Sequence, residues 1–178
     1  MQEQSLAGKL EQLISKLGKS HTSVDHLCNW ATANLSLLEG EADYGQELLY
    51  IQPVHKLVNE ASQYLRFSRI LLLPYLDELV KKQSENHDCR QCSGSCSVRH
   101  TVQIQNIQEA HRKMKQAKLE LNHAVWPSYA DAGPDAAYLP LREIVLQLET
   151  VISELNQLEE SELIPLILEA QKNIHAHS

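Results

Sequence analysis

The sequence is poor in residues that break regular structure, and it has no long apolar run. Its 178 residues include six glycines and six prolines, which argues against collagen-like, low-complexity and disordered chains. No apolar stretch approaches the roughly 20 residues that span a bilayer, and the first ten residues lack the features of a signal peptide. We therefore expect a cytoplasmic protein that does not bind membranes.

Aromatic residues and positive charge are also scarce. Aromatic residues make up 5% of the chain, with one phenylalanine and two methionines, so a methionine-rich groove for many partners is not expected. The formal net charge is -7, which argues against nucleic acid as a partner. The chain has neither a glycine-rich phosphate loop nor a nucleophile elbow, and we expect no turnover of an organic substrate. A protein partner and a homodimer both stay open.

What the sequence does contain is apolar residues at helical spacing over four long segments. No segment alternates polar and apolar residues in the manner of a strand. Four amphipathic helices with short connections predict an all-α, antiparallel up-down four-helix bundle, in a single domain spanning residues 1–178. In the second helix the inward stripe is expected to include Leu71, and in the fourth Glu159, Glu162 and Leu166. The expected helices cover about residues 3–38, 48–84, 98–125 and 139–175.

An approximate internal repeat divides the chain into two hairpins. Pro74 and Pro165 are 91 residues apart (74 to 165) in similar apolar surroundings, and each is expected to kink its helix without ending it. His21 and His111 are 90 residues apart (21 to 111), each on the inward stripe of the first helix of a hairpin. The bundle is therefore expected to be two duplicated helical hairpins.

The run LNQLEESELIPL, which ends at Leu166, resembles the His-x-x-x-Glu-Glu-x-x-Leu-Phe-Pro signature of hemerythrin-like domains. The resemblance implies a di-iron centre bound by a His and a Glu one turn apart, with another His from the first helix of each hairpin. His21 and His111 match the first-helix histidines, and Glu159 matches the carboxylate of the fourth helix.

The sequence also departs from that signature. Leu155 stands where the signature has His, and Tyr64 and Ser68 replace His and Glu in the second helix. A full di-iron set is therefore not available. The resemblance predicts a degenerate hemerythrin-like bundle whose central site is lost, mononuclear or rebuilt from other residues.

Three of the four cysteines cluster in a predicted loop at about residues 84–100. Cys89, Cys92, Cys96 and His100 follow the pattern C-x2-C-x3-C-x3-H, and a helix beginning near Cys96 would place Cys96 and His100 on one face. Such ligands suit zinc, and three cysteines with a fourth ligand also suit an iron–sulfur cluster. Cys28 and His87 are candidate extra ligands. Thiol-redox or disulfide chemistry and free thiols without a role are the alternatives.

The bundle core offers a second candidate metal site. His21, His111 and Glu159 are all predicted to point inward, and Tyr64 would lie near them. Histidines paired with a buried Glu can also serve only as hydrogen-bonded core residues. Because the helix phase is uncertain by one residue, two other acids compete with Glu159 for the inward position, namely Glu160 and Glu162.

These patterns predict a metal-binding protein that senses or handles a metal, O2, NO or redox state, with zinc or iron as the cofactor. The iron would be non-haem iron or an iron–sulfur cluster. A metal-free helical interaction module and a thiol redox switch are the alternatives. A di-iron oxidase would need more core carboxylates than the sequence offers.

Overall fold

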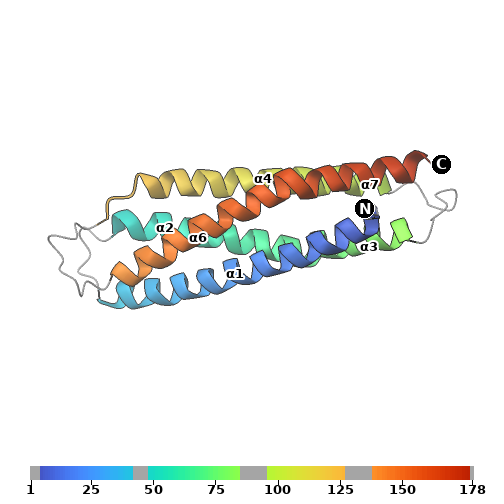
Figure 1. The fold of residues 1–178 in the computed structure, drawn as a ribbon. Coiled ribbons are helices and arrows are strands. Elements are labelled where there is room, and N and C mark those ends of the chain that lie inside the picture. Colours follow the sequence, from blue (N-terminus) through green and yellow to red (C-terminus); the bar gives the residue numbers. More distant parts are fainter. Residues whose placement is uncertain (1–4, 42–47, 85–95, 127–137, 177–178) are drawn as a thin grey trace. The chain divides into compact units, whose positions relative to one another are not determined.

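A computed structural model describes residues 5–41, 48–84, 96–126 and 138–176 of the chain. The fold is all-α: four long helices pack as a bundle, and the described residues contain no strand (Figure 1). The predicted fold class is therefore confirmed. In chain order the elements are α1 (Leu6–Glu41), α2 (Leu48–Phe67), η1 (Ser68–Leu72), α3 (Leu73–Ser84), α4 (Cys96–Asn122), α6 (Tyr138–Leu158), η3 (Glu159–Leu163) and α7 (Ile164–Ala176).

The ends of the helices have local causes. Ser5 caps α1, because its side-chain oxygen accepts a hydrogen bond from the Gly8 amide at 3.2 Å. α1 then runs without a break through Gly18 to Glu41, three residues beyond the predicted end of the first helix. α4 ends at Asn122, before the predicted end of the third helix at about residue 125, and Val125 is 64% exposed beyond it.

The chain divides into two compact units, and each unit draws on all four long helices. Unit 1 comprises residues 1–20, 66–109 and 154–178, and unit 2 comprises residues 21–65 and 110–153. The unit 1 core is mainly leucine, with buried Ser68, Asn156 and Glu159 as its polar members. The unit 2 core is more mixed, because two histidines and several tyrosines are buried among its aliphatic residues.

Polar contacts between helices tie each unit together at its surface. In unit 2, the Lys56 ammonium of α2 binds the Glu120 carboxylate of α4 at 2.6 Å. The Lys118 ammonium of α4 donates to the Glu149 carbonyl of α6 at 3.3 Å. In unit 1, the Gln83 side chain donates to the Ala170 carbonyl at 3.1 Å. One of these contacts is exposed and the other two are partly buried. Contacts near the surface contribute little stability, so the buried apolar stripes hold the helices together.

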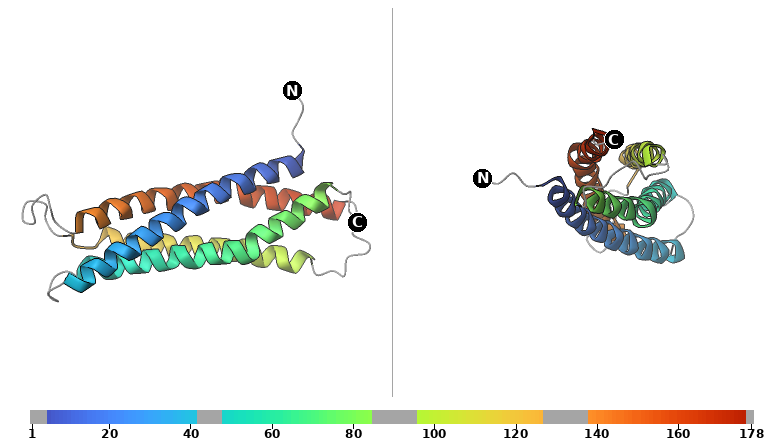
Figure 2. Two further views of the ribbon diagram at one scale, coloured as in Figure 1. Left: turned by 90° about the horizontal axis from the view of Figure 1, so that it is seen from below. Right: turned by 90° about the vertical axis from the view of Figure 1, so that its right-hand side faces the viewer.

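Two π-helices interrupt the second and fourth long helices at equivalent positions of the repeat. η1 and η3 each contain five residues, and the second begins and ends 91 residues after the first (68 to 159, 72 to 163). In each, the amide after the π-helix donates to its first carbonyl, and a proline follows: Pro74 or Pro165. Because proline has no amide hydrogen and its ring crowds the preceding turn, a wider turn upstream accommodates it. α3 and α7 run on past the two prolines to Ser84 and Ala176, so neither proline ends its helix, as predicted. Figure 2 shows the second and fourth long helices as continuous ribbons.

The π-helices shift the buried stripe by one residue, which corrects the pattern predicted from sequence. Leu71 is 47% exposed, and its neighbour Leu72 is fully buried instead. In the fourth helix, Leu163 and Ile167 are buried where Glu162 and Leu166 were expected. A π-turn has more residues per turn than the 3.6 of an α-helix, so one extra residue passes before the chain faces the core again.

Among the described residues, none of the helices combines the length and the apolar character that crossing a membrane requires.

Candidate functional site

A cluster of three buried polar rings lies in the core of unit 2. His21 of α1, Tyr64 of α2 and His111 of α4 are 4%, 2% and 2% exposed. The His21 and Tyr64 ring centroids are 5.9 Å apart with an interplanar angle of 71°, and those of Tyr64 and His111 are 6.3 Å apart at 57°. The prediction that both histidines point inward near Tyr64 is confirmed, and both imidazoles lie beside the same phenol ring.

Glu159 is also fully buried, which settles the helix phase at this position. Glu160 is exposed, and Glu162 makes an ion pair at the surface of unit 1. Glu159 is therefore the inward acid, as the sequence analysis preferred. It belongs to unit 1, whereas the cluster of three rings belongs to unit 2.

The repeat places Ser68 at the position equivalent to Glu159. Both residues are fully buried, and each is the first residue of its π-helix. The sequence similarity around the two prolines predicts that Ser68 and Glu159 are equivalent. No sequence pattern predicts the π-helices themselves. Single π-helical turns inside α-helices are frequent at functional sites.

The donors in the described residues restrict the kind of metal centre they could form. No group of three His, Cys, Asp or Glu side chains within these residues is arranged to hold a metal ion. The His21 and His111 imidazoles with the Tyr64 phenol would form a three-donor set suited to one borderline cation, such as zinc or iron. The set is too small for a di-iron centre, which also needs bridging carboxylates.

Cys28, predicted as an extra ligand, is a buried free thiol in unit 2. Its sulfur donates to the Val58 carbonyl at 4.0 Å, and burial raises the pKa of the thiol to about 11. The thiol is therefore protonated at neutral pH. Only a bound cation would make it a thiolate, which is the form that binds metals.

The predicted cysteine loop lies mostly outside the described residues. That applies to Cys89, Cys92 and His87. The structure begins α4 at Cys96, as the sequence analysis required, and His100 follows in the same helix. These two residues are thus one helical turn apart along α4.

Two further described histidines, His26 and His55, make contacts that fit structural roles. His26 is exposed on α1, and its ring packs on Trp30 with centroids 4.2 Å apart. His55 of α2 bonds the Glu39 carboxylate at 2.8 Å, and both side chains are about half exposed. Neither histidine belongs to the buried cluster.

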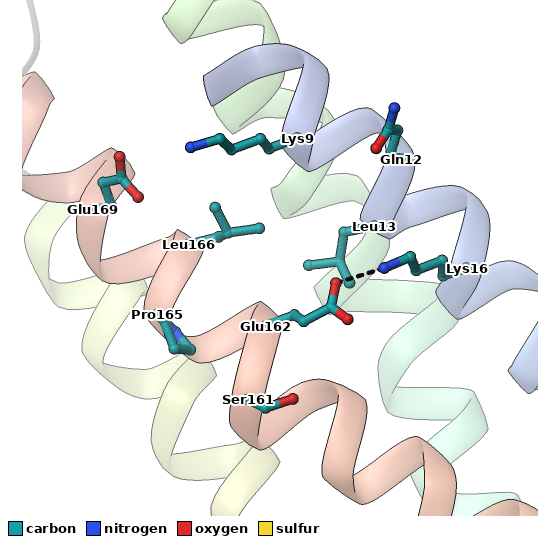
Figure 3. A pocket seen from close by; sticks show the side chains of 9 residues that line it. All are labelled: Lys9, Gln12, Leu13, Lys16, Ser161, Glu162, Pro165, Leu166 and Glu169. Carbon is teal, nitrogen blue, oxygen red and sulfur yellow. Dashed lines mark hydrogen bonds and ion pairs between the residues drawn. The ribbon is translucent and has the colours of Figure 1, made fainter. Parts of the chain in front are cut away.

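A groove of about 320 Å³ runs along unit 1 between α1 and the fourth long helix. Its floor is apolar, with Leu13 and Leu166 projecting into it (Figure 3). Lys16 on one wall pairs with Glu162 on the other at 2.7 Å (Figure 3). Since basic and acidic groups face each other across the groove, it offers no net charge to attract an ionic ligand.

Aromatic side chains gather in unit 2 in an arrangement that the sequence analysis missed. Tyr50 stacks on Trp126 with ring centroids 4.7 Å apart, and Tyr138 lies 6.3 Å from Tyr50. The Arg142 guanidinium lies 6.0 Å from the centre of the Trp126 ring. These residues come from three separate stretches of chain, since Tyr138 and Arg142 share α6, so no local pattern reveals the cluster.

The fold and the site define an all-α helical bundle with a buried histidine–tyrosine–histidine cluster. Comparison with protein-family models, curated proteins and solved structures finds no match to this chain.

Proposed function

We propose that this chain is a divergent hemerythrin-like bundle that binds a metal ion and senses or handles metal, O2, NO or redox state. The observation that carries the proposal is the buried cluster of His21, Tyr64 and His111 in unit 2. The two histidines occupy equivalent positions of the repeat, on the first helix of each hairpin. Burying two imidazoles against one phenol costs desolvation, which coordination to a cation would offset.

The matched π-helices support the same assignment. They begin at Ser68 and Glu159, the positions that correspond in the resemblance to the carboxylates of the two hairpins. Of these two positions, only the second keeps an acid. A single zinc or iron ion is therefore the metal we propose for the core, in place of a pair of irons. The cysteines of the predicted loop, with His100, are a second donor set that we propose from the sequence alone.

The test is the metal content per chain and the absorption spectrum of untagged protein purified without oxygen. We expect one bound zinc or iron that the double variant His21→Leu, His111→Leu loses. The variant His26→Leu is the matched control, because His26 is an exposed histidine of the same helix, and it should keep the metal.

The cysteine variants separate the two donor sets. If Cys89→Ser with Cys92→Ser removes the metal and the histidine variant keeps it, the core is not the metal site and the loop is. A chain without metal in every preparation, including one reconstituted with zinc and with ferrous iron, would refute the proposal. A metal-free interaction module would then be the better assignment, and the exposed Ile70 and Leu71 of η1 favour it.

A further inference from the structure

An apolar stripe lies on the solvent side of the second long helix in unit 1. It consists of Phe67, Ile70, Leu71 and Pro74. Ile70 is 59% exposed and Leu71 is 47% exposed, Pro74 is exposed, and Phe67 is partly exposed. We call these four residues the apolar stripe. Contiguous exposed apolar surface on one helix face marks an interaction site more often than scattered apolar residues do.

The repeat shows that the fold does not require apolar residues on this face. At the equivalent positions of the fourth long helix, 91 residues later, Ser161 and Glu162 stand where the apolar stripe has Ile70 and Leu71. Glu162 there binds the Lys16 ammonium. Both helices contain the same π-helix and the same proline, so the backbone tolerates polar side chains at these positions. The apolar stripe therefore needs a cause other than helix formation.

The exposed charges beside the apolar stripe have both signs. Arg66 stands before it and Asp77 after it, and Arg69 lies between them. Arg66 directly follows the buried Leu65, and Asp77 directly follows the buried Leu76. Arg66 and Asp77 thus lie at the same angle from the buried face, on the same edge of the helix, with the apolar stripe between them along the axis. Both side chains are exposed.

We propose that the apolar stripe is the contact surface of a homodimer in which two copies of this chain pack antiparallel. A twofold axis near Leu71 would bring the two apolar stripes together and place Arg66 of each copy opposite Asp77 of the other. A basic group at one end and an acidic group at the other make the surface self-complementary only in this antiparallel order. In the parallel order, Arg66 of each copy would lie at the level of Arg66 of the other, and no pair of opposite charges would form.

The size of the surface sets the expected strength. One pair of short helix faces is at the low end of specific interfaces, so we expect reversible association in the micromolar range. The contact would centre on Ile70 and Leu71, since central apolar residues usually carry most of the binding free energy. This inference does not depend on metal binding, and its test uses the full chain with any metal it carries.

The test is sedimentation velocity over concentrations from the low micromolar to the hundred-micromolar range. We expect the wild-type chain to shift from monomer to dimer, and Leu71→Glu, which copies the residue of the other hairpin, to weaken association by about tenfold or more. Leu168→Glu is the matched control, because Leu168 is 44% exposed on α7 in the same unit, and it should dimerise like the wild type. Far-UV circular dichroism checks that both variants keep the wild-type helix content.

A charge exchange tests the antiparallel order. Arg66→Asp alone and Asp77→Arg alone should each weaken the dimer, and the two together should restore it, because each opposed pair is then rebuilt with its signs exchanged. A wild-type chain that stays monomeric throughout overturns the proposal. So does a dimer that Leu71→Glu leaves intact, or one that the double exchange fails to restore.

Discussion

The shift of the buried stripe at η1 makes a sharp stability prediction for two adjacent leucines. Leu72 is fully buried and Leu71 is 47% exposed. Replacing leucine by alanine removes three carbon atoms, worth about 2.4 kcal/mol when all are buried, and the cavity left behind raises the cost to about 3–5 kcal/mol. At Leu71 about half of that transfer term applies and water fills the space, so the cost is about 1 kcal/mol. We therefore expect Leu72→Ala to lower the free energy of unfolding by at least about 2 kcal/mol more than Leu71→Ala.

The assay is urea unfolding at equilibrium, followed by far-UV circular dichroism at a protein concentration below that of dimer formation. The same comparison in the fourth long helix pairs Leu163→Ala, a fully buried leucine, with Leu166→Ala, a partly exposed one. If Leu71→Ala costs as much as Leu72→Ala or more, Leu71 is buried in solution and the wider turn at η1 does not set the buried face. That result would refute the shift of the buried face at η1. It would also refute the exposure of Leu71, on which the proposed homodimer depends.

Three further predictions follow from the pKa shifts and the surface contacts. In a variant whose other three cysteines are serine, Cys28 should react with iodoacetamide at pH 8 far more slowly in native protein than in urea, because burial raises the pKa of its thiol to about 11; equal rates would contradict the burial. Burial raises the pKa of Glu149 above 4.5, against the opposing effect of the nearby Lys118. The protonated form is thus favoured in the fold, so stability is lost as pH rises through the raised pKa, and Glu149→Gln should be more stable than wild type at neutral pH but not at a pH below 4.5. Lys16→Ala should lower the free energy of unfolding by less than about 1 kcal/mol, since its ion pair with Glu162 is exposed, and the difference should shrink in high salt.

The helices themselves could be predicted because their cause is local. Apolar residues at steps of three and four, with few glycines and prolines, favour amphipathic helices whatever their neighbours. The predicted second and fourth helices agree with the structure to within about a residue at each end. Helix ends fray, so helix boundaries are rarely defined more closely than one or two residues. The first helix extends further than predicted, through Gly40, because one glycine in an otherwise helical stretch costs only about 1 kcal/mol.

The inward direction of the candidate residues could also be predicted, but only up to the π-helices. α1 and α4, which carry His21 and His111, contain no π-helix, and Tyr64 precedes η1 in the second long helix. All three side chains are buried, as predicted. Leu71 and Glu162 lie within the π-helices, and the prediction placed both on the wrong face. The two prolines predicted that each helix would depart from regular α-helical geometry near these residues. They did not predict that the departure would be a π-helix.

The sequence by itself determined the helical fold class, the duplication and the inward position of two histidines and one acid, because helix periodicity acts within a few residues. Only the tertiary structure decided which side chains meet. The approach of His21 and His111 to one tyrosine depends on the packing of three helices. The burial of Leu72 in place of Leu71 depends on the π-helix η1 and on the core that Leu72 faces. Such contacts join residues far apart in the chain, and their free energy comes from burying apolar surface against other elements, which no local pattern records.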